Sequence, residues 1–171
     1  MSNGAREFSR LVPLTRLGSE PYRQEIEATA EERQQLAQRF DLIALDKLAA
    51  VVTLERLGGE LIRLESSFEA EFSQNCVVML EPVPGRVTQT FALLYGPLEE
   101  SHGEIDIDAD EPAFEPLIGD TIDIGEAVAQ ELSLALPEFP RLPDAVLDVA
   151  DSAEADDGPF AALERLRSKQ F

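Results

Sequence analysis

The chain has 171 residues, 44% of them hydrophobic, and a formal net charge of -20. This length suits one domain with tails, and the apolar content excludes a chain that is disordered throughout. The chain has neither an apolar run of about 20 residues, as a transmembrane helix needs, nor the apolar core of a signal peptide. We therefore expect a cytoplasmic protein that does not bind membranes. A single cysteine excludes an internal disulfide and a cysteine-based zinc site.

The first predicted elements are two strands and a helix. Phe8–Leu14 is expected to be a strand at a sheet edge because it contains a proline, and Tyr22–Ala28 a second strand. Thr29 and Glu32 have the spacing of a capping box, in which each residue's side chain satisfies a backbone amide of the other. The sequence therefore predicts a helix over Ala30–Arg39.

A long hairpin is the clearest local pattern. Leu48–Leu57 is rich in β-branched and apolar residues, and the pair Gly58-Gly59 suits a tight two-residue turn. The returning strand alternates between apolar and polar residues, which predicts one buried face and one solvated face. The residues expected to face inward are Leu64, Ser66, Phe68, Ala70 and Phe72.

A short apolar run, a turn and two further predicted strands follow. Cys76–Leu80 is a short apolar run in which the cysteine is expected to be a small core residue, and Glu81–Gly85 is predicted to be a turn. Arg86–Tyr95 is expected to form a long strand. Glu104–Asp108 is expected to form a shorter strand with its two isoleucines inward.

A second helix and a tail follow. Asp123–Glu126 resembles a capping box, and the helix after it should run to Leu136, because Pro137 ends it. We expect an α+β domain over residues 1–143, with a long central hairpin and two packed helices, whose antiparallel sheet could be barrel-like. Residues 144–158 are predicted to be a flexible acidic linker and residues 159–171 a short amphipathic basic helix.

Charge is distributed unevenly along the chain. The fifty-four residues Val87–Pro140 contain no Lys or Arg but thirteen Asp or Glu, whereas the first sixty-three residues carry nine bases and ten acids. Because phosphates are bound mainly by Lys and Arg, the second half should repel nucleic acid and attract a basic partner. The alternative is that the acidity only keeps the protein soluble.

Tests for a catalytic, cofactor or metal site are negative. The acidic run that starts at Asp106 lacks the glycine and glutamate of a calcium loop, whose positions are taken by Glu111 and Leu117. His102, the only histidine, is expected in an exposed turn. Cys76 is not expected to be a nucleophile, because no nearby cation would favour its thiolate.

The terminal helix is the candidate functional segment. An amphipathic helix on a flexible tether can dock into a groove of a partner. The alternative is that the same apolar side folds back onto the domain's own sheet. The candidate docking residues are Phe160, Leu163, Leu166, Arg165 and Arg167.

Several segments, taken in order, resemble a known family. They are EFSRLVPL, the long hairpin, a cysteine followed by Leu80-Glu81-Pro82, IDIGEAVAQELSLALP, and GPFAALERLR. The chain resembles the YceD family, whose members are described as large ribosomal RNA subunit accumulation proteins. The resemblance implies a non-enzymatic role in accumulation or assembly of the large ribosomal subunit and its RNA.

The chain departs from that family at its cysteines. Many members have a C-x-x-C where this chain reads Cys76-Val77-Val78-Met79, and often further cysteines where it reads residues 138–143. A zinc site of that kind is therefore not carried over to this chain, and packing must take its place.

We hypothesise an accessory factor that binds a basic protein, such as a ribosomal protein or a ribosome-assembly factor. Direct RNA contact is possible through the more basic N-terminal third but is disfavoured by charge, and no DNA binding is expected. The alternatives are a general acidic interaction module or nucleic-acid mimic unrelated to ribosomes, and an enzyme that uses a carboxylate-bound divalent metal.

Overall fold

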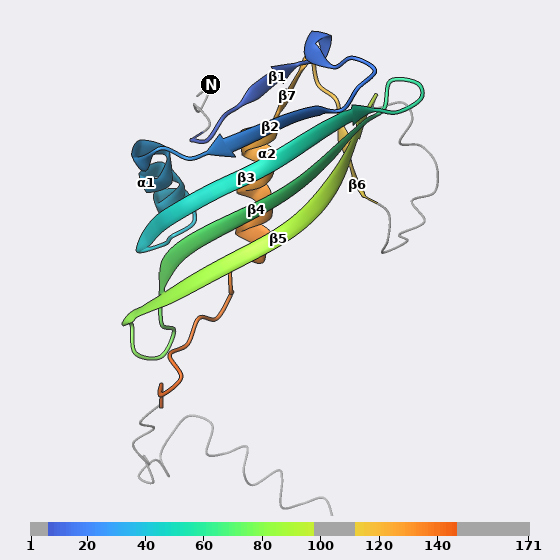
Figure 1. Cartoon of the computed structure of the whole chain (residues 1–171). Helices are drawn as coiled ribbons and strands as arrows, with labels where there is room; N and C mark the ends of the chain where they lie inside the picture. The colour runs from blue at the N-terminus through green and yellow to red at the C-terminus, as the bar shows by residue number, and fades with distance from the viewer. Residues whose placement is uncertain (1–6, 98–111, 147–171) are drawn as a thin grey trace, which may run out of the picture.

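The computed structural model describes residues 7–97 and 112–146, which form a mostly antiparallel sheet with two helices (Figure 1). The α+β prediction is therefore confirmed. The elements in chain order are β1 (Leu11–Pro13), a 3₁₀ turn (Leu14–Arg16), β2 (Tyr22–Glu27), α1 (Ala30–Arg39), β3 (Ala44–Arg56), β4 (Ile62–Asn75), β5 (Pro82–Gly96), β6 (Ala113–Pro116), β7 (Thr121–Asp123) and α2 (Ile124–Ala135).

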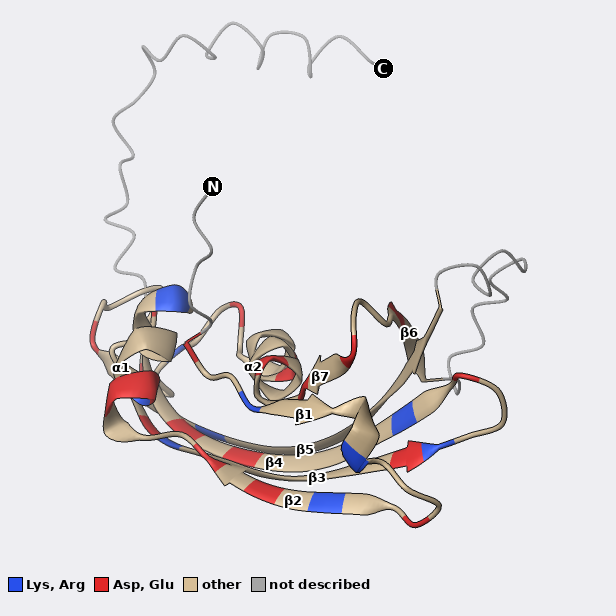
Figure 2. Cartoon of the chain, turned by 90° about the horizontal axis from the view of Figure 1, so that it is seen from above, with Lys and Arg blue, Asp and Glu red and all other residues tan. Residues whose placement is uncertain are grey.

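The main sheet has the strand order β2-β3-β4-β5-β6, and only the β5–β6 pair is parallel. Strands β1 and β7 form a separate antiparallel pair. Figure 2 shows that α2 and the β1–β7 pair lie on one side of the curved main sheet, while α1 lies at one end of it. The sheet is open, with β2 and β6 at its two edges, so it is not barrel-like.

The core fills the space between the main sheet and the layer of α2 and β1–β7. Alternate residues of β3 and β4 face this layer, as the period of two in a strand requires. The predicted inward face of β4 is confirmed, because all five of its residues are buried. The fully buried large side chains include Phe8, Val12, Leu48, Leu54, Leu64, Phe68, Ile122, Ile124 and Leu132.

Helix α1 has the predicted bounds, and its capping box is present. The Thr29 amide donates to the Glu32 carboxylate at 2.8 Å, and the Glu32 amide donates to the Thr29 hydroxyl at 3.3 Å. The helix connects two neighbouring antiparallel strands, β2 and β3, and buries Leu36 and Ala37. The sequence therefore located this element correctly from its cap and its apolar stripe.

The hairpin of β3 and β4 is confirmed, but its predicted two-residue turn is wrong. The Leu57 amide donates to the Leu61 carbonyl at 2.9 Å, so three residues close the loop. Gly59 has a φ of 76°, a conformation that glycine adopts without steric cost. The glycine pair indicated the position of the turn but not its length.

The predicted strand Phe8–Leu14 is too long. Only Leu11–Pro13 pairs with a strand, at an edge as expected, and Leu14–Arg16 forms a 3₁₀ turn. The Arg10 amide donates to the side chain of Asp123 at 2.8 Å instead of to a neighbouring strand. At the start of this segment, a side-chain acceptor therefore takes the place of the backbone hydrogen bonds between paired strands.

The predicted turn at Glu81–Gly85 is also wrong, because β5 begins at Pro82 and pairs with β4 from that residue onward. The other side of β5 is paired with β6 only from Leu93 to Gly96. Prolines are tolerated in a strand whose second edge is free. The turn lies earlier, at residues 77–79, and it leaves most of the apolar run Cys76–Leu80 exposed.

Helix α2 confirms the second predicted helix, which ends just before Pro137. The Asp123 side chain accepts from the Glu126 amide at the first turn. The sequence analysis missed β6 and β7, which are short and lack a clear alternation. The predicted strand at Glu104–Asp108 lies outside the described residues.

Candidate functional site

The docking residues predicted from sequence cannot be placed in the fold. Phe160, Leu163, Arg165, Leu166 and Arg167 all lie outside the described residues. The same is true of His102 and the acidic run from Asp106. The candidate sites in the fold are therefore the surfaces that the described elements form.

The outer face of the main sheet is the surface turned away from α2. None of the described elements covers it (Figure 2). Two open hollows lie on this face, with volumes of about 510 Å³ and 710 Å³. Their floors consist mainly of short side chains, including Ala49, Val51, Ser67, Thr90 and Ala92.

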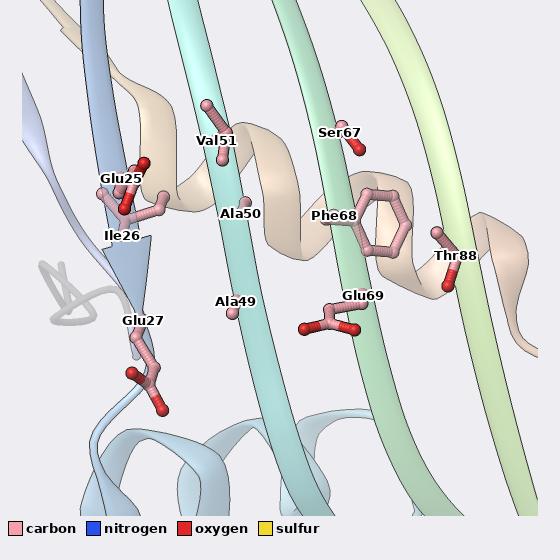
Figure 3. Close-up of a pocket in the computed structure, with 10 residues that line it drawn as sticks. All are labelled: Glu25, Ile26, Glu27, Ala49, Ala50, Val51, Ser67, Phe68, Glu69 and Thr88. Carbon is pink, nitrogen blue, oxygen red and sulfur yellow. The ribbon is translucent and has the colours of Figure 1, made fainter.

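Glutamates stand beside the smaller hollow, as Figure 3 shows. Strand pairing places Glu27, Ala49 and Glu69 side by side on three neighbouring strands, with Glu25 further along β2. Adjacent strands are about 4.8 Å apart, so the backbones that carry Glu27 and Glu69 are separated by about 10 Å. Ala49 leaves the space between the two carboxylates open.

These carboxylates are not equivalent. Glu69 forms ion pairs with Lys47 and, at 3.4 Å, with Arg86. The pKa of Glu69 is lowered, chiefly by the hydrogen bond from Lys47. Glu25 has one long contact with Arg23, of 3.8 Å between exposed side chains. Glu27 forms no ion pair with any described residue, so its negative charge is uncompensated on this face.

Most described bases already have partners within the chain. Six form ion pairs, and two donate to backbone carbonyls instead. The ion-paired bases are Arg10, Arg23, Arg39, Lys47, Arg63 and Arg86, and the carbonyl-bound ones are Arg33 and Arg56. Few cations in this part of the chain are therefore available to a phosphate backbone.

A polar junction joins the first described residues to both helices. The Asp123 carboxylate accepts from the Ser9 hydroxyl at 2.6 Å and from the Arg10 amide at 2.8 Å. The Arg10 guanidinium binds Glu32 through two nitrogens, at 2.6 and 2.9 Å. The hydrogen bond from Arg10 lowers the pKa of Glu32 to about 2. These carboxylates are occupied by structural donors, so the junction holds elements together and offers no free acid or base.

A second ion-pair group strengthens the same end of the molecule. Arg39, in the last turn of α1, binds the carboxylate of Glu126 at 2.8 and 3.0 Å and that of Glu7 at 3.1 Å. The hydrogen bond from Glu126 is the main cause of the raised pKa of Arg39. This group therefore ties α1 to the first turn of α2.

Cys76 is fully buried, as the sequence predicted. Its pKa is nevertheless lowered, chiefly by a hydrogen bond from the Leu142 backbone, with smaller contributions from the Met79 and Val78 backbones and from the positive charge of Arg141. The prediction that no cation lies near this thiol is therefore wrong, because the fold brings Arg141 close to it; neither this contact nor the backbone donors could be located before the fold was known. Burial separates this thiol from solvent, and the described residues contain no group of three or more side chains able to hold a metal ion.

The turn that contains Cys76 lies against the segment that follows α2. The Val77 amide donates to the Pro140 carbonyl at 2.9 Å, and the Gln74 side chain donates to the Pro137 carbonyl at 3.2 Å. These are the two regions in which the family resemblance placed cysteines. Direct hydrogen bonds join them in this chain.

The described part of the chain therefore offers binding surfaces, and we find no catalytic constellation in it. Among the described helices, none is both long and apolar enough to cross a membrane.

Comparison with known proteins identifies the family. Neither a curated protein nor a solved structure matches the chain significantly. A family model described as "Large ribosomal RNA subunit accumulation protein YceD" matches residues 64–167, which is more than half of the chain. The match begins within β4 and includes α2 together with the whole of IDIGEAVAQELSLALP. The resemblance inferred from the sequence is confirmed, and the chain belongs to the YceD family.

Proposed function

We propose that this protein is a non-enzymatic accessory factor for accumulation of the large ribosomal subunit and its RNA. It acts by binding a basic protein, such as a ribosomal protein or an assembly factor. Family membership supports the ribosomal role. The observation that carries the mode of action is the uncovered outer face, where Glu25 and Glu27 stand beside a floor of short side chains.

The geometry of this face suits a basic side chain. A Lys or Arg laid across Ala49 would come between Glu27 and Glu69 and contact both carboxylates. Glu27 would gain a partner that it lacks among the described residues. An arginine could bind a carboxylate through two nitrogens, which strengthens and orients the contact.

The same charges disfavour direct RNA binding at this face. The bases on it, Arg23, Lys47, Arg63 and Arg86, all form ion pairs with glutamates. A phosphate would have to displace a carboxylate to reach them. Repulsion from the uncompensated charge of Glu27 would oppose its approach.

The test is a pull-down of the tagged full-length protein from its own lysate, with and without ribonuclease. We expect a basic large-subunit protein or assembly factor to be retained after ribonuclease treatment. Recovery of large-subunit components only while RNA is intact would contradict direct protein recognition.

A charge-reversal variant makes this test specific to the outer face. Glu25→Lys with Glu27→Lys should reduce recovery of the partner at least about fivefold, because like charges oppose each other across the interface. The matched control is Glu20→Lys with Glu60→Lys, which makes the same change in net charge at two exposed residues outside the strands and should bind like the wild type. Equal loss in both variants would indicate a nonspecific effect of net charge and would refute this site.

A further inference from the structure

An exposed apolar tip lies at the end of the molecule where β4 turns into β5. Val77, Met79 and Leu80 in this turn expose 46%, 47% and 76% of their surface, and Phe139 after α2 exposes 72%. The hydrogen bond from Val77 to Pro140 holds the two segments side by side. Contiguous exposed apolar side chains of this size are typical of an interaction site.

Backbone strain at the tip strengthens this interpretation. Leu80 has a φ of 59°, in the left-handed region that leucine rarely adopts. The Leu80 side chain is exposed, so packing against the described residues does not offset the free-energy cost of this backbone conformation. Strained residues concentrate at functional positions, where the side chain is needed for another reason.

The charges near the tip indicate what binds there. Glu81 adjoins the turn, Glu138 precedes Phe139, and Asp144 follows within the same segment. Arg141 is the single base of that described segment, residues 137–146. An apolar surface with a mainly acidic surround fits a segment that is both apolar and basic.

We propose that the apolar tip is the docking site of the chain's own residues 159–171. This segment supplies three large apolar residues at helical spacing and three bases, so it complements the tip in both respects. The apolar residues are Phe160, Leu163 and Leu166, and the bases are Arg165, Arg167 and Lys169. This inference is independent of the partner proposed for the outer sheet face.

The attachment point favours this occupant over a free protein. The described chain ends at Val146, a few residues after Leu142, whose backbone contacts Cys76 in the turn. Twelve residues, 147–158, then lead to Pro159. A flexible tether of this length has a root-mean-square span of about 20 Å. Its end segment has an effective concentration in the millimolar range, which exceeds that of most cellular proteins.

Hydrogen exchange of the full-length protein tests this proposal. We would follow peptides that cover residues 76–81 and 137–146 by mass spectrometry in the variant with Leu163→Asp and Leu166→Asp. Exchange at these peptides should rise about tenfold, because an effective concentration about ten times the dissociation constant leaves the tip free roughly a tenth of the time. The matched control, Ala161→Asp with Ser168→Asp, adds the same charge on the opposite side of the predicted helix and should leave exchange unchanged.

The reciprocal variant alters the tip instead of the tail. Leu80→Asn removes an apolar side chain at a position where asparagine tolerates the backbone conformation, so the domain stays folded. It should accelerate exchange in residues 159–171, whereas Ile118→Asn, at another exposed apolar residue, should not. Unchanged exchange at the tip in the Leu163/Leu166 variant would overturn the proposal. Protection of the tip that increases with protein concentration would also overturn the proposal. The segment bound there would then come from a second copy of the chain.

Discussion

Gly125 is expected to be indispensable for the packing of α2. A Cβ atom at this position would lie 2.5 Å from the Phe8 carbonyl oxygen and 3.0 Å from the Arg10 amide nitrogen. Both are backbone atoms, so the first described segment must move to accommodate Gly125→Ala. Two hydrogen bonds depend on its present place, from Arg10 to the Asp123 carboxylate and from Ile124 to the Arg10 carbonyl.

The expected size of the effect follows from these contacts. Losing an amide–carbonyl bond costs about 1 kcal/mol, and losing a bond to a charged acceptor costs about 1.5–3 kcal/mol. Alanine is better than glycine in a helix by about 1 kcal/mol, which offsets part of this loss. We therefore expect Gly125→Ala to lower the free energy of unfolding by about 1.5–3 kcal/mol.

Equilibrium unfolding in urea, followed by circular dichroism, measures this change. For a domain of this size the midpoint should fall by about 1 M. Gly18→Ala is the control, because its Cβ would meet no atom within 4 Å, and its stability should stay within about 0.5 kcal/mol of the wild type. A Gly125→Ala protein as stable as the wild type would refute the argument, since only its helical propensity would then matter.

Three further substitutions have defined outcomes. Glu32→Gln keeps the capping pattern but loses the charge paired with Arg10, and should cost about 1 kcal/mol at pH 7. Because the pKa of Glu32 is lowered to about 2, its contribution is present above the unfolded value of about 4.3. The contribution is lost as pH falls toward 2, so urea unfolding should show the gap to wild type narrowing between about pH 5 and pH 2. Gly85→Ala should cost about 1–2 kcal/mol, because its Cβ would lie 2.4 Å from the Phe72 ring, and a double-mutant cycle should show a smaller cost in a Phe72→Leu background. Ser66→Ala should raise the thermal midpoint, with a gain of up to about 1 kcal/mol, because the buried hydroxyl has no hydrogen-bond partner among the described residues. A lower midpoint would contradict this account.

The sequence was most informative where a local rule decides the structure. The capping residues Thr29 and Asp123 located both helices, and strict alternation along β4 identified its buried face. It failed where a distant contact overrides the local signal. Arg10 donates to the side chain of Asp123 instead of to a neighbouring strand. The prolines at the start of β5 are tolerated because no described strand pairs with its second edge there.

The candidate surfaces were harder to predict. Acidity pointed to a basic partner, but the acids on the outer sheet face come from β2 and β4, whereas the sequence argument rested on residues after Arg86. Opposite charges that face each other on neighbouring strands form ion pairs. Only the strand register shows which charges are paired in this way. The same holds for the apolar tip, because the sequence predicted burial of Cys76 but did not show that the turn exposes Val77, Met79 and Leu80.

The pairing of β1 with β7 has a consequence for synthesis of the chain. Residues 11–13 cannot pair until residues 121–123 have been synthesised. The long hairpin therefore leaves the ribosome well before the layer that covers its apolar face. Until Leu132 has followed, Phe68 and Leu64 are exposed to water and to other nascent chains. A ribosome that stalls between β5 and β7 would therefore carry an aggregation-prone sheet. Slower translation of the hairpin itself would not shorten the exposure of its apolar face, because that face is covered only after α2 has been synthesised.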